Sequence, residues 1–230
     1  MKKLDPRFAQ KIGAEYALFP LAAPHYGECQ KLVAEIATLH SGNRLPVLEL
    51  GCGTGLTNQE LRRRMPSARI TAVDTEEVMI AQAQELLGDS VEFVCEDALG
   101  YLQGQPDGSF GCVVTAFCFH NMPPDYRAKV FNEIGRVLCS GGALVVGDKI
   151  AQDDVLEHWE SLKVQIDAFA VFQTTDYPEL QAEWTAHYLE DDRIRLTEKE
   201  QRELFALAGC TQPQLHRRWC MDAVFSGVKE

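Results

Sequence analysis

Three glycines at alternate positions, Gly51, Gly53 and Gly55, follow the short apolar stretch 47–50 and precede residues 56–64, which we expect to form a helix. A turn from a strand into a helix exposes backbone N–H groups, and the helix N-terminus adds a partial positive charge. Each glycine lacks the Cβ atom that would keep a ligand away from the backbone. We therefore predict a small-molecule site at the carboxyl end of the first strand.

The spacing and charge around these glycines indicate the kind of ligand. They read G-x-G-x-G, whereas dinucleotide-binding loops read G-x-G-x-x-G, and the G-K-[ST] ending of a P-loop is missing. Glu49 lies two residues before the first glycine, where its carboxylate would repel a pyrophosphate but not a cationic ligand. Asp74 follows the second predicted strand, 69–73, at the place where a carboxylate holds ribose hydroxyls in nucleoside-binding α/β folds. A positively charged nucleoside fits both carboxylates.

The pattern E-x-G-x-G-x-G with an acidic residue ending the next strand resembles the class I S-adenosylmethionine-dependent methyltransferases, from about residue 45 to the C-terminus. The resemblance implies a Rossmann-like, doubly wound α/β fold. Its seven-stranded sheet would be mostly parallel, with an antiparallel last strand and helices on both faces. In this family Gly51 and Gly53 would line the methionine part of S-adenosyl-L-methionine, and Asp74 would hold the ribose. Asp97 matches the acidic residue near the adenine amino group.

Two further segments match the family. The turn Ser140-Gly141-Gly142 corresponds to its Pro-Gly-Gly turn before strand five, with serine in place of proline. The N-terminal cap, residues 1–26, carries Tyr16 and Tyr26, and tyrosines of this segment often close on the cofactor's amino-acid end in the family; alternatively both simply pack. The predicted cofactor-binding residues are Glu49, Gly51, Cys52, Gly53, Gly55, Asp74, Thr75, Asp97, Ala98, Ala116, Phe117, Tyr16 and Tyr26.

Hydrophobic periodicity predicts the elements that position these residues. Thr75 is expected to cap the helix after Asp74, and Gly88 to end it. Thr197 and Glu200 read as a capping box that opens the last helix. The expected helices are residues 27–41, 56–64, 75–87, 125–138 and 197–208; the expected strands are 47–50, 69–73, 91–94, 110–116, 143–147, 214–219 and 221–228.

Two polar groups follow central strands and therefore face the ligand crevice. His120, after strand 110–116, has an unperturbed pKa that suits a general base, or it merely shapes the pocket or caps the next helix. Methyl transfer to sulfur or to a neutral amine needs no base. Asp148 and Lys149, after strand five, would contact acceptor or cofactor, or form a solvent-facing ion pair.

Residues 151–196 read as an insertion in a single domain that spans 1–230. Steps of three and four predict two helices, which would form a lid, an acceptor pocket or a dimer face, or would only pack. The first helix carries the apolar stripe Val155, Trp159, Leu162, Ile166 and Phe169. The second carries Leu180, Trp184 and Tyr188 at steps of four, and an antiparallel pair of helices would place these aromatic residues over the crevice. The aromatic residues of the insertion favour a homodimer.

Composition narrows the class of protein. The net charge of −12 and the absence of long Lys/Arg runs make nucleic acid an unlikely partner. The eight cysteines show no zinc-ligand spacing, so we expect reduced thiols and no metal site. The N-terminus lacks the apolar core of a signal peptide, and no run of eighteen apolar residues occurs, so a cytoplasmic protein without a membrane span is expected.

Three functions remain open. The first is methyl transfer to a small-molecule acceptor that is held under residues 151–196. The second rests on Gly141–Lys149, the acidic insertion and Trp219, which are similar to the carboxy-S-adenosylmethionine synthase family of the tRNA wobble-uridine modification pathway. Such chemistry would want an arginine on the extra carboxylate, and the sequence does not place one. The third is a cofactor-binding partner subunit without catalysis.

Overall fold

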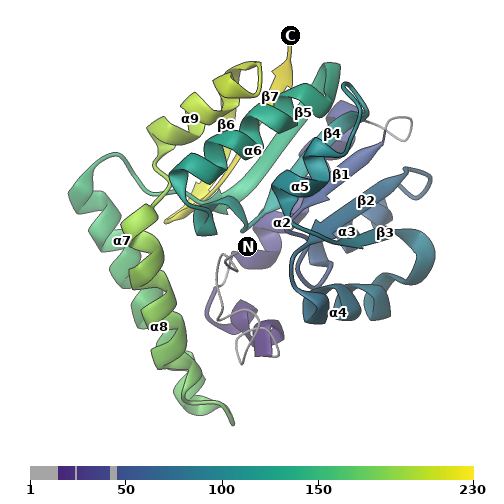
Figure 1. The fold of residues 1–230 in the computed structure, drawn as a ribbon. Helices are drawn as coiled ribbons and strands as arrows, with labels where there is room; N and C mark the ends of the chain where they lie inside the picture. Colours follow the sequence, from purple (N-terminus) through teal and green to yellow (C-terminus); the bar gives the residue numbers. More distant parts are fainter. Residues whose placement is uncertain (1–14, 24, 42–45) are drawn as a thin grey trace.

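The computed structural model describes residues 15–23, 25–41 and 46–230 (Figure 1). Its centre is a seven-stranded sheet in the order β3-β2-β1-β4-β5-β7-β6. The first five strands run parallel, whereas β7 lies antiparallel between β5 and β6. The predicted fold class is thereby confirmed. The strands are β1 (Val47–Leu50), β2 (Ile70–Asp74), β3 (Glu92–Cys95), β4 (Phe110–Ala116), β5 (Leu138–Lys149), β6 (Cys210–Trp219) and β7 (Asp222–Lys229).

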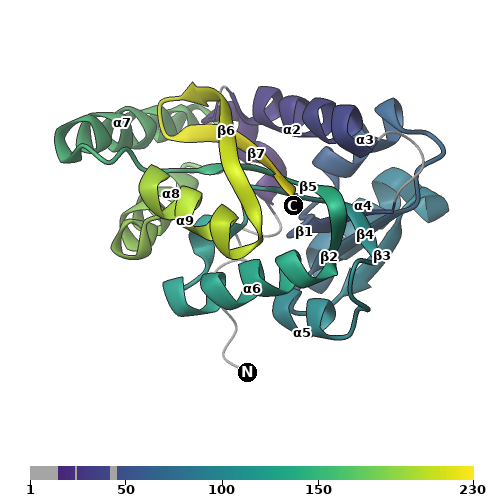
Figure 2. The same cartoon turned by 90° about the horizontal axis from the view of Figure 1, so that it is seen from above.

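Helices cover both faces of the sheet (Figure 2). Successive residues of a strand point to opposite faces, so Val47 packs under α2 and α3 while Leu48 packs under α5, α6 and α9. The central strand β4 is buried along its whole length, as its continuous apolar run predicts. The helices of the first face are α2 (Tyr26–Ser41), α3 (Leu56–Arg64) and α4 (Glu77–Leu87); those of the second are α5 (Ala98–Gln103), α6 (Pro124–Val137) and α9 (Glu198–Leu207).

The insertion forms two helices, α7 (Val155–Ala168) and α8 (Leu180–Asp191), which lie side by side beyond one end of the sheet (Figures 1 and 2). Its two ends meet, because Ala151 N–H donates to Leu196 O at 2.8 Å and Glu198 N–H donates to Ala151 O at 3.1 Å. Short 3-10 turns complete the described structure: η1 (Tyr16–Leu21), η2 (Gly88–Ser90), η3 (Phe119–Asn121), η4 (Phe169–Thr174) and η5 (Asp192–Ile194).

An aromatic cluster joins the insertion to the N-terminal segment. The Phe19 ring of η1 lies tilted against Trp184 of α8 with ring centroids 4.4 Å apart, and Tyr188 of α8 meets Phe169 edge to face at 5.0 Å. Leu180, Trp184 and Tyr188, which stand at the predicted steps of four, are all buried on one face of α8. Residues 1–14 and 24 of the predicted N-terminal cap lie outside the described residues.

The apolar stripe expected for α7 is not buried at two positions. Val155 and Trp159 are 52% and 49% exposed, and His158 is buried in their place. Nε2 of His158 lies 2.6 Å from a carboxylate oxygen of Asp192. This polar contact turns His158 toward the interior, and Val155 and Trp159 toward solvent. A search for apolar periodicity does not detect such a contact.

Two predicted caps also differ. Helix α4 begins at Glu77, and Thr75 does not cap it, because the Asp74 carboxylate already accepts the Glu76 N–H at 3.0 Å. At α9 the Thr197 hydroxyl accepts the Glu200 N–H at 3.1 Å, which is half of the expected capping box. The Glu200 side chain turns away to bind Arg127 at 2.7 Å.

That arginine is completely buried in α6 and ties three segments together. Its guanidinium donates to the carbonyl oxygens of Phe119 at 3.1 Å, Met122 at 2.8 Å and Ile194 at 2.9 Å. Arg127 therefore fixes the loop after β4 and the chain that leaves the insertion. None of the helices in the described part of the chain is long and apolar enough to cross a membrane.

Helix α6 approaches the end of α9 so closely that it needs glycine at position 135. A Cβ atom there would lie 2.9 Å from the backbone of Ala208. We expect Gly135→Ala to lower the free energy of unfolding by about 1–3 kcal/mol, although alanine favours helices. Urea denaturation measures the change. Gly27→Ala in α2 is the matched control, because a Cβ atom there meets no atom within 4 Å; equal stability of the two variants would contradict the tight contact.

Candidate functional site

A pocket opens at the carboxyl ends of the parallel strands. Its wall is built by the glycine loop, the ends of β2 and β3, the loop after β4, and the aromatic residues of η1 and α2. The predicted residues that line it are Tyr16, Tyr26, Gly51, Cys52, Gly53, Asp74, Thr75, Asp97, Ala98, Ala116 and Phe117. Residues that the sequence analysis missed also line it: Gln30, Thr54, Leu56, Thr57, Val73, Glu76, Met79, Glu96, Cys118, Asn121, Met122 and Tyr126.

The glycine loop has a left-handed backbone, with φ of 69° at Gly51 and 52° at Gly53. Gly51 N–H donates to Val73 O at 2.8 Å, which ties the loop to the end of β2. A Cβ atom at Gly51 would lie 2.3 Å from the Cys118 sulfur, so only glycine lets the two loops meet. At Gly53 a Cβ atom would meet no atom within 4 Å, so glycine there keeps the floor of the pocket clear.

Asp74 connects the end of β2 to the glycine loop. One carboxylate oxygen accepts the Gly53 N–H at 2.8 Å, and the other accepts the Glu76 N–H at 3.0 Å. Burial raises the pKa of this carboxyl, and the two N–H donors oppose the shift. Each oxygen keeps a further lone pair, so the carboxylate can accept hydrogen bonds from a ligand as well.

Asp97 and Ala98 stand at the other end of the pocket. Asp97 caps α5 by accepting the Gly100 N–H at 3.0 Å and also accepts the Tyr126 hydroxyl. That hydroxyl in turn accepts the Leu99 N–H at 3.1 Å. This wall is therefore held rigid by hydrogen bonds that the chain makes with itself.

Aromatic rings close the side of the pocket that faces the insertion. The Tyr26 ring lies over Phe117 with centroids 4.7 Å apart, and the Tyr26 hydroxyl donates to the Tyr16 hydroxyl at 3.0 Å. Burial raises the pKa of Tyr16 to about 12, so the hydroxyl stays protonated at neutral pH. Behind it, the Tyr16 ring meets Trp184 of α8 at 5.9 Å.

The charged side chains of the pocket wall are all acidic. Four of its residues carry carboxylates: Asp74, Glu76, Glu96 and Asp97. None of the lining residues in ranges 15–23, 25–41 and 46–230 is Lys, Arg or His. Such a wall favours a cationic ligand and disfavours phosphate groups.

Glu49, Gly55 and His120 were predicted as site residues but do not line the pocket. Glu49 lies buried in β1 below the glycine loop, and burial raises the pKa of its carboxyl well above the usual range. Gly55 has φ of 85°, and a Cβ atom there would press on Ala83 of α4 at 3.1 Å, so it serves the packing of helices. Neither residue reaches the ligand space directly.

His120 lies behind the pocket wall in η3, where it is buried. Its Nδ1 is 2.5 Å from an oxygen of Asp148, and its Nε2 faces Asp191 of α8 at 3.8 Å. The expected solvent-facing pair of Asp148 and Lys149 is wrong. Asp148 is completely buried and accepts the Phe119 N–H at 2.8 Å, while the Lys149 ammonium binds Asp191 at 2.7 Å. The reason is that η3 packs on Asp148, while α8 covers Lys149.

Comparison with known proteins gives three relevant similarities. Residues 47–142 match the family described as "Methyltransferase domain". The chain is 30% identical over 125 residues to malonyl-[acyl-carrier protein] O-methyltransferase 1 of Ilyobacter polytropus, covering 52% of this chain and 45% of that protein. It is 31% identical over 191 residues to carboxy-S-adenosyl-L-methionine synthase of Pseudomonas paraeruginosa, covering 77% of this chain and 71% of that protein.

Among solved structures, human N-acetylserotonin methyltransferase in complex with SAM is similar, with a TM-score of 0.64 and 14% identity. The similarity covers 99% of this chain and 59% of the human chain, and at that identity it shows the fold alone. The chain spans about half the length of the first curated relatives that it matches, 45% and 52%.

Glu49 gives a pH test of the site. Its pKa is raised above the ordinary value of 4.5, so the unfolded chain loses this proton at lower pH than the folded chain. Below pH 4.5 the carboxyl is protonated in both the folded and the unfolded chain, and the free energy of unfolding is not reduced by this group. As the pH rises from 4.5 through the folded-state pKa, the free energy of unfolding falls. We expect Glu49→Gln to have the same melting temperature as the wild type at about pH 4 and a higher melting temperature than the wild type at about pH 8.

Thermal melts at both pH values measure this difference. Glu85→Gln, at an exposed position of α4, is the control and should follow the wild type throughout. A Glu49→Gln curve that also follows the wild type at every pH would mean that the carboxyl is not desolvated.

Proposed function

The chain belongs to the class I S-adenosylmethionine-dependent methyltransferase family, and on that premise we propose that it transfers a methyl group from S-adenosyl-L-methionine to a small-molecule acceptor. The observation that carries the proposal is the pocket wall with four carboxylates, in which no described residue is basic. S-adenosyl-L-methionine bears a sulfonium and an ammonium against one carboxylate, so this wall suits its net charge.

The shape and the polar groups of the pocket fit this cofactor. Gly51 and Gly53 leave room for the backbone to touch the methionine part, and Asp74 has lone pairs for the ribose hydroxyls. Asp97 and Ala98 would border the adenine. Tyr16, Tyr26 and Phe117 would close on the amino-acid end.

When bound, S-adenosyl-L-methionine supplies a methyl group on a positively charged sulfur, ready for direct attack by a nucleophile. The chain's own residues then have to orient the two partners and exclude water. The rings of Tyr26 and Phe117 exclude water, and the rigid loop after β4 sets the position of the acceptor. His120 has no proton-transfer role in this proposal, because its two ring nitrogens face Asp148 and Asp191.

A second candidate is synthesis of a carboxylated cofactor, which the similarity to carboxy-S-adenosyl-L-methionine synthase favours. A carboxylate added at the sulfonium would need a cationic partner in the pocket. The pocket-lining residues that the structure describes offer none, and the ammonium of Lys149 lies in a separate cavity behind the loop. The charge of the pocket wall therefore supports methyl transfer as the first candidate.

Removing the ribose partner tests the cofactor site. We expect Asp74→Ala to weaken binding of S-adenosyl-L-methionine by about 1.5–3 kcal/mol, tenfold to a hundredfold, because paired hydrogen bonds are lost. Gly53→Arg should abolish binding, because its side chain would fill the pocket floor. Calorimetry measures both, with the exposed Asp89→Ala as control. Binding unchanged in Asp74→Ala and Gly53→Arg would refute the assigned pocket.

The two candidate reactions differ in their product. Mass spectrometry of the ligand released from the purified protein is expected to find S-adenosyl-L-methionine or S-adenosylhomocysteine, and incubation with candidate small-molecule acceptors should release S-adenosylhomocysteine. A carboxylated cofactor in the released ligand would instead establish the second candidate. No turnover with any acceptor, despite cofactor binding, would favour a non-catalytic partner subunit.

A further inference from the structure

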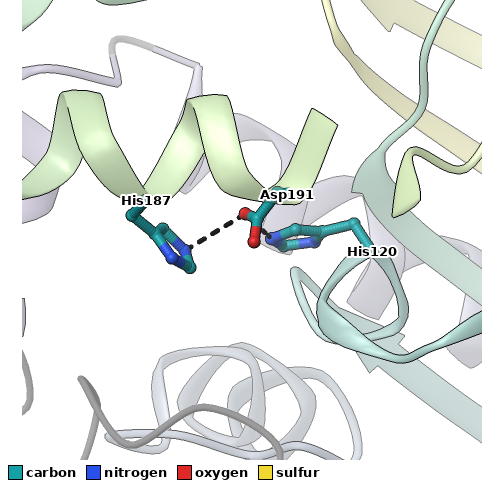
Figure 3. A group of neighbouring side chains, drawn as sticks. All are labelled: His120, His187 and Asp191. Carbon is teal, nitrogen blue, oxygen red and sulfur yellow. Dashed lines mark ion pairs between the residues drawn. The ribbon is translucent and has the colours of Figure 1, made fainter. Parts of the chain in front are cut away.

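A second polar cluster lies behind the loop after β4, outside the pocket described above. His120 comes from η3, and His187 and Asp191 come from α8 (Figure 3). The His187 Nε2 atom is 3.2 Å, and the His120 Nε2 atom 3.8 Å, from the same oxygen of Asp191. One nitrogen or oxygen of each residue lies within 4.8 Å of the others, and all three side chains are buried. Two imidazoles and a carboxylate thus converge on one point.

The local structure favours this convergence. His187 and Asp191 are four residues apart, so the helix places both side chains on one face. His120 approaches from a different segment, which is held by the hydrogen bonds of Arg127 to the carbonyl oxygens of Phe119 and Met122. The positions of all three groups are therefore set by packed backbone rather than by a mobile loop.

A buried carboxylate also orients the His120 ring. Nδ1 of His120 lies 2.5 Å from Asp148, which is itself fixed by the N–H groups of Phe119 and Lys149. The hydrogen bond at Nδ1 leaves Nε2 directed at Asp191 and His187. Histidines that bind metals are typically oriented in this way by an outer carboxylate, so Asp148 is a second, independent indication.

We propose that His120, His187 and Asp191 bind a divalent transition-metal cation of the zinc type. Two histidines and one carboxylate suit Zn²⁺ and its neighbours, and a fourth position is usually left to water or substrate. His120 and Asp191 line a small cavity together with Tyr188, Leu196 and Met221, and with the cationic side chains of Lys149 and Arg195. The fourth position would open into this cavity, between the insertion and the loop after β4.

Lys149 is the competitor of such a cation. Its ammonium lies 2.7 Å from the same Asp191 oxygen and 4.0 Å from the centre of the Tyr188 ring. A metal ion that binds Asp191 displaces the Lys149 ammonium from this carboxylate. The ammonium keeps its cation–π contact with the Tyr188 ring. The affinity for the metal is therefore lowered by the free energy needed to break the ion pair between Lys149 and Asp191.

Binding of Zn²⁺ and Co²⁺ to the purified, tag-free chain tests the proposal. The chain used for the test carries Cys95→Ser and Cys220→Ser, because these two thiols are exposed and thiolates are strong ligands of Zn²⁺ and Co²⁺. We expect one equivalent of Zn²⁺ by calorimetry, and visible absorption of Co²⁺ typical of nitrogen and oxygen ligands. His187→Gln should weaken binding by more than the roughly tenfold to hundredfold that the loss of an outer-shell partner costs, because it removes a ligand. Lys149→Met should tighten it, because the competing ammonium is gone.

His216→Gln is the matched control, since this histidine lies on β6 beside Ser226 and not in the cluster. Its affinity for Zn²⁺ should equal that of the parent chain. Circular dichroism establishes that each variant is folded, and Lys149→Met decides the case if His187→Gln does not fold. The proposal is overturned if the parent chain and Lys149→Met both fail to bind Zn²⁺, or if a folded His187→Gln binds it as tightly as the parent.

Discussion

The close approach of Gly51 to Cys118 is the constraint on which the pocket depends. Strands β1 and β4 are parallel neighbours in the sheet, so the loops that leave their carboxyl ends must pass each other. A Cβ atom at Gly51 would lie 2.3 Å from the Cys118 sulfur, and glycine alone removes this clash. The loop after β4 then lies directly against the glycine loop, and Asp74 ties the latter to β2. One wall carries the backbone amides, and the facing wall carries the aromatic rings.

The sequence predicted the parts of this arrangement that depend on local chemistry. Strand β4 at 110–116 and helix α3 at 56–64 have the predicted bounds, because a buried central strand is continuously apolar and a helix after glycines ends before proline. The glycine loop and Asp74 were recognisable because a short motif fixes both their spacing and their backbone. These features need no information about distant segments.

The remainder depends on contacts between segments far apart in the chain. Asp148 and Lys149 read as a surface pair, yet η3 binds Asp148, and Asp191 of α8, some forty residues later in the sequence, binds Lys149. Val155 and Trp159 fit a helical period, but the contact between His158 and Asp192 turns them outward. Asn121 and Tyr126 line the pocket without any motif of their own. A signal was available only for the loop itself, since it follows the carboxyl end of a central strand.

The meeting of Ala151 with Leu196 and Glu198 has an evolutionary consequence. Because the insertion leaves the end of β5 and returns beside it at the start of α9, a segment of different length or sequence can span the same two ends. Closure entropy grows only slowly with loop length, so such an exchange would leave the sheet and the glycine loop intact. Helices α7 and α8 can therefore be replaced as a unit in evolution, while the sheet and the glycine loop are inherited unchanged.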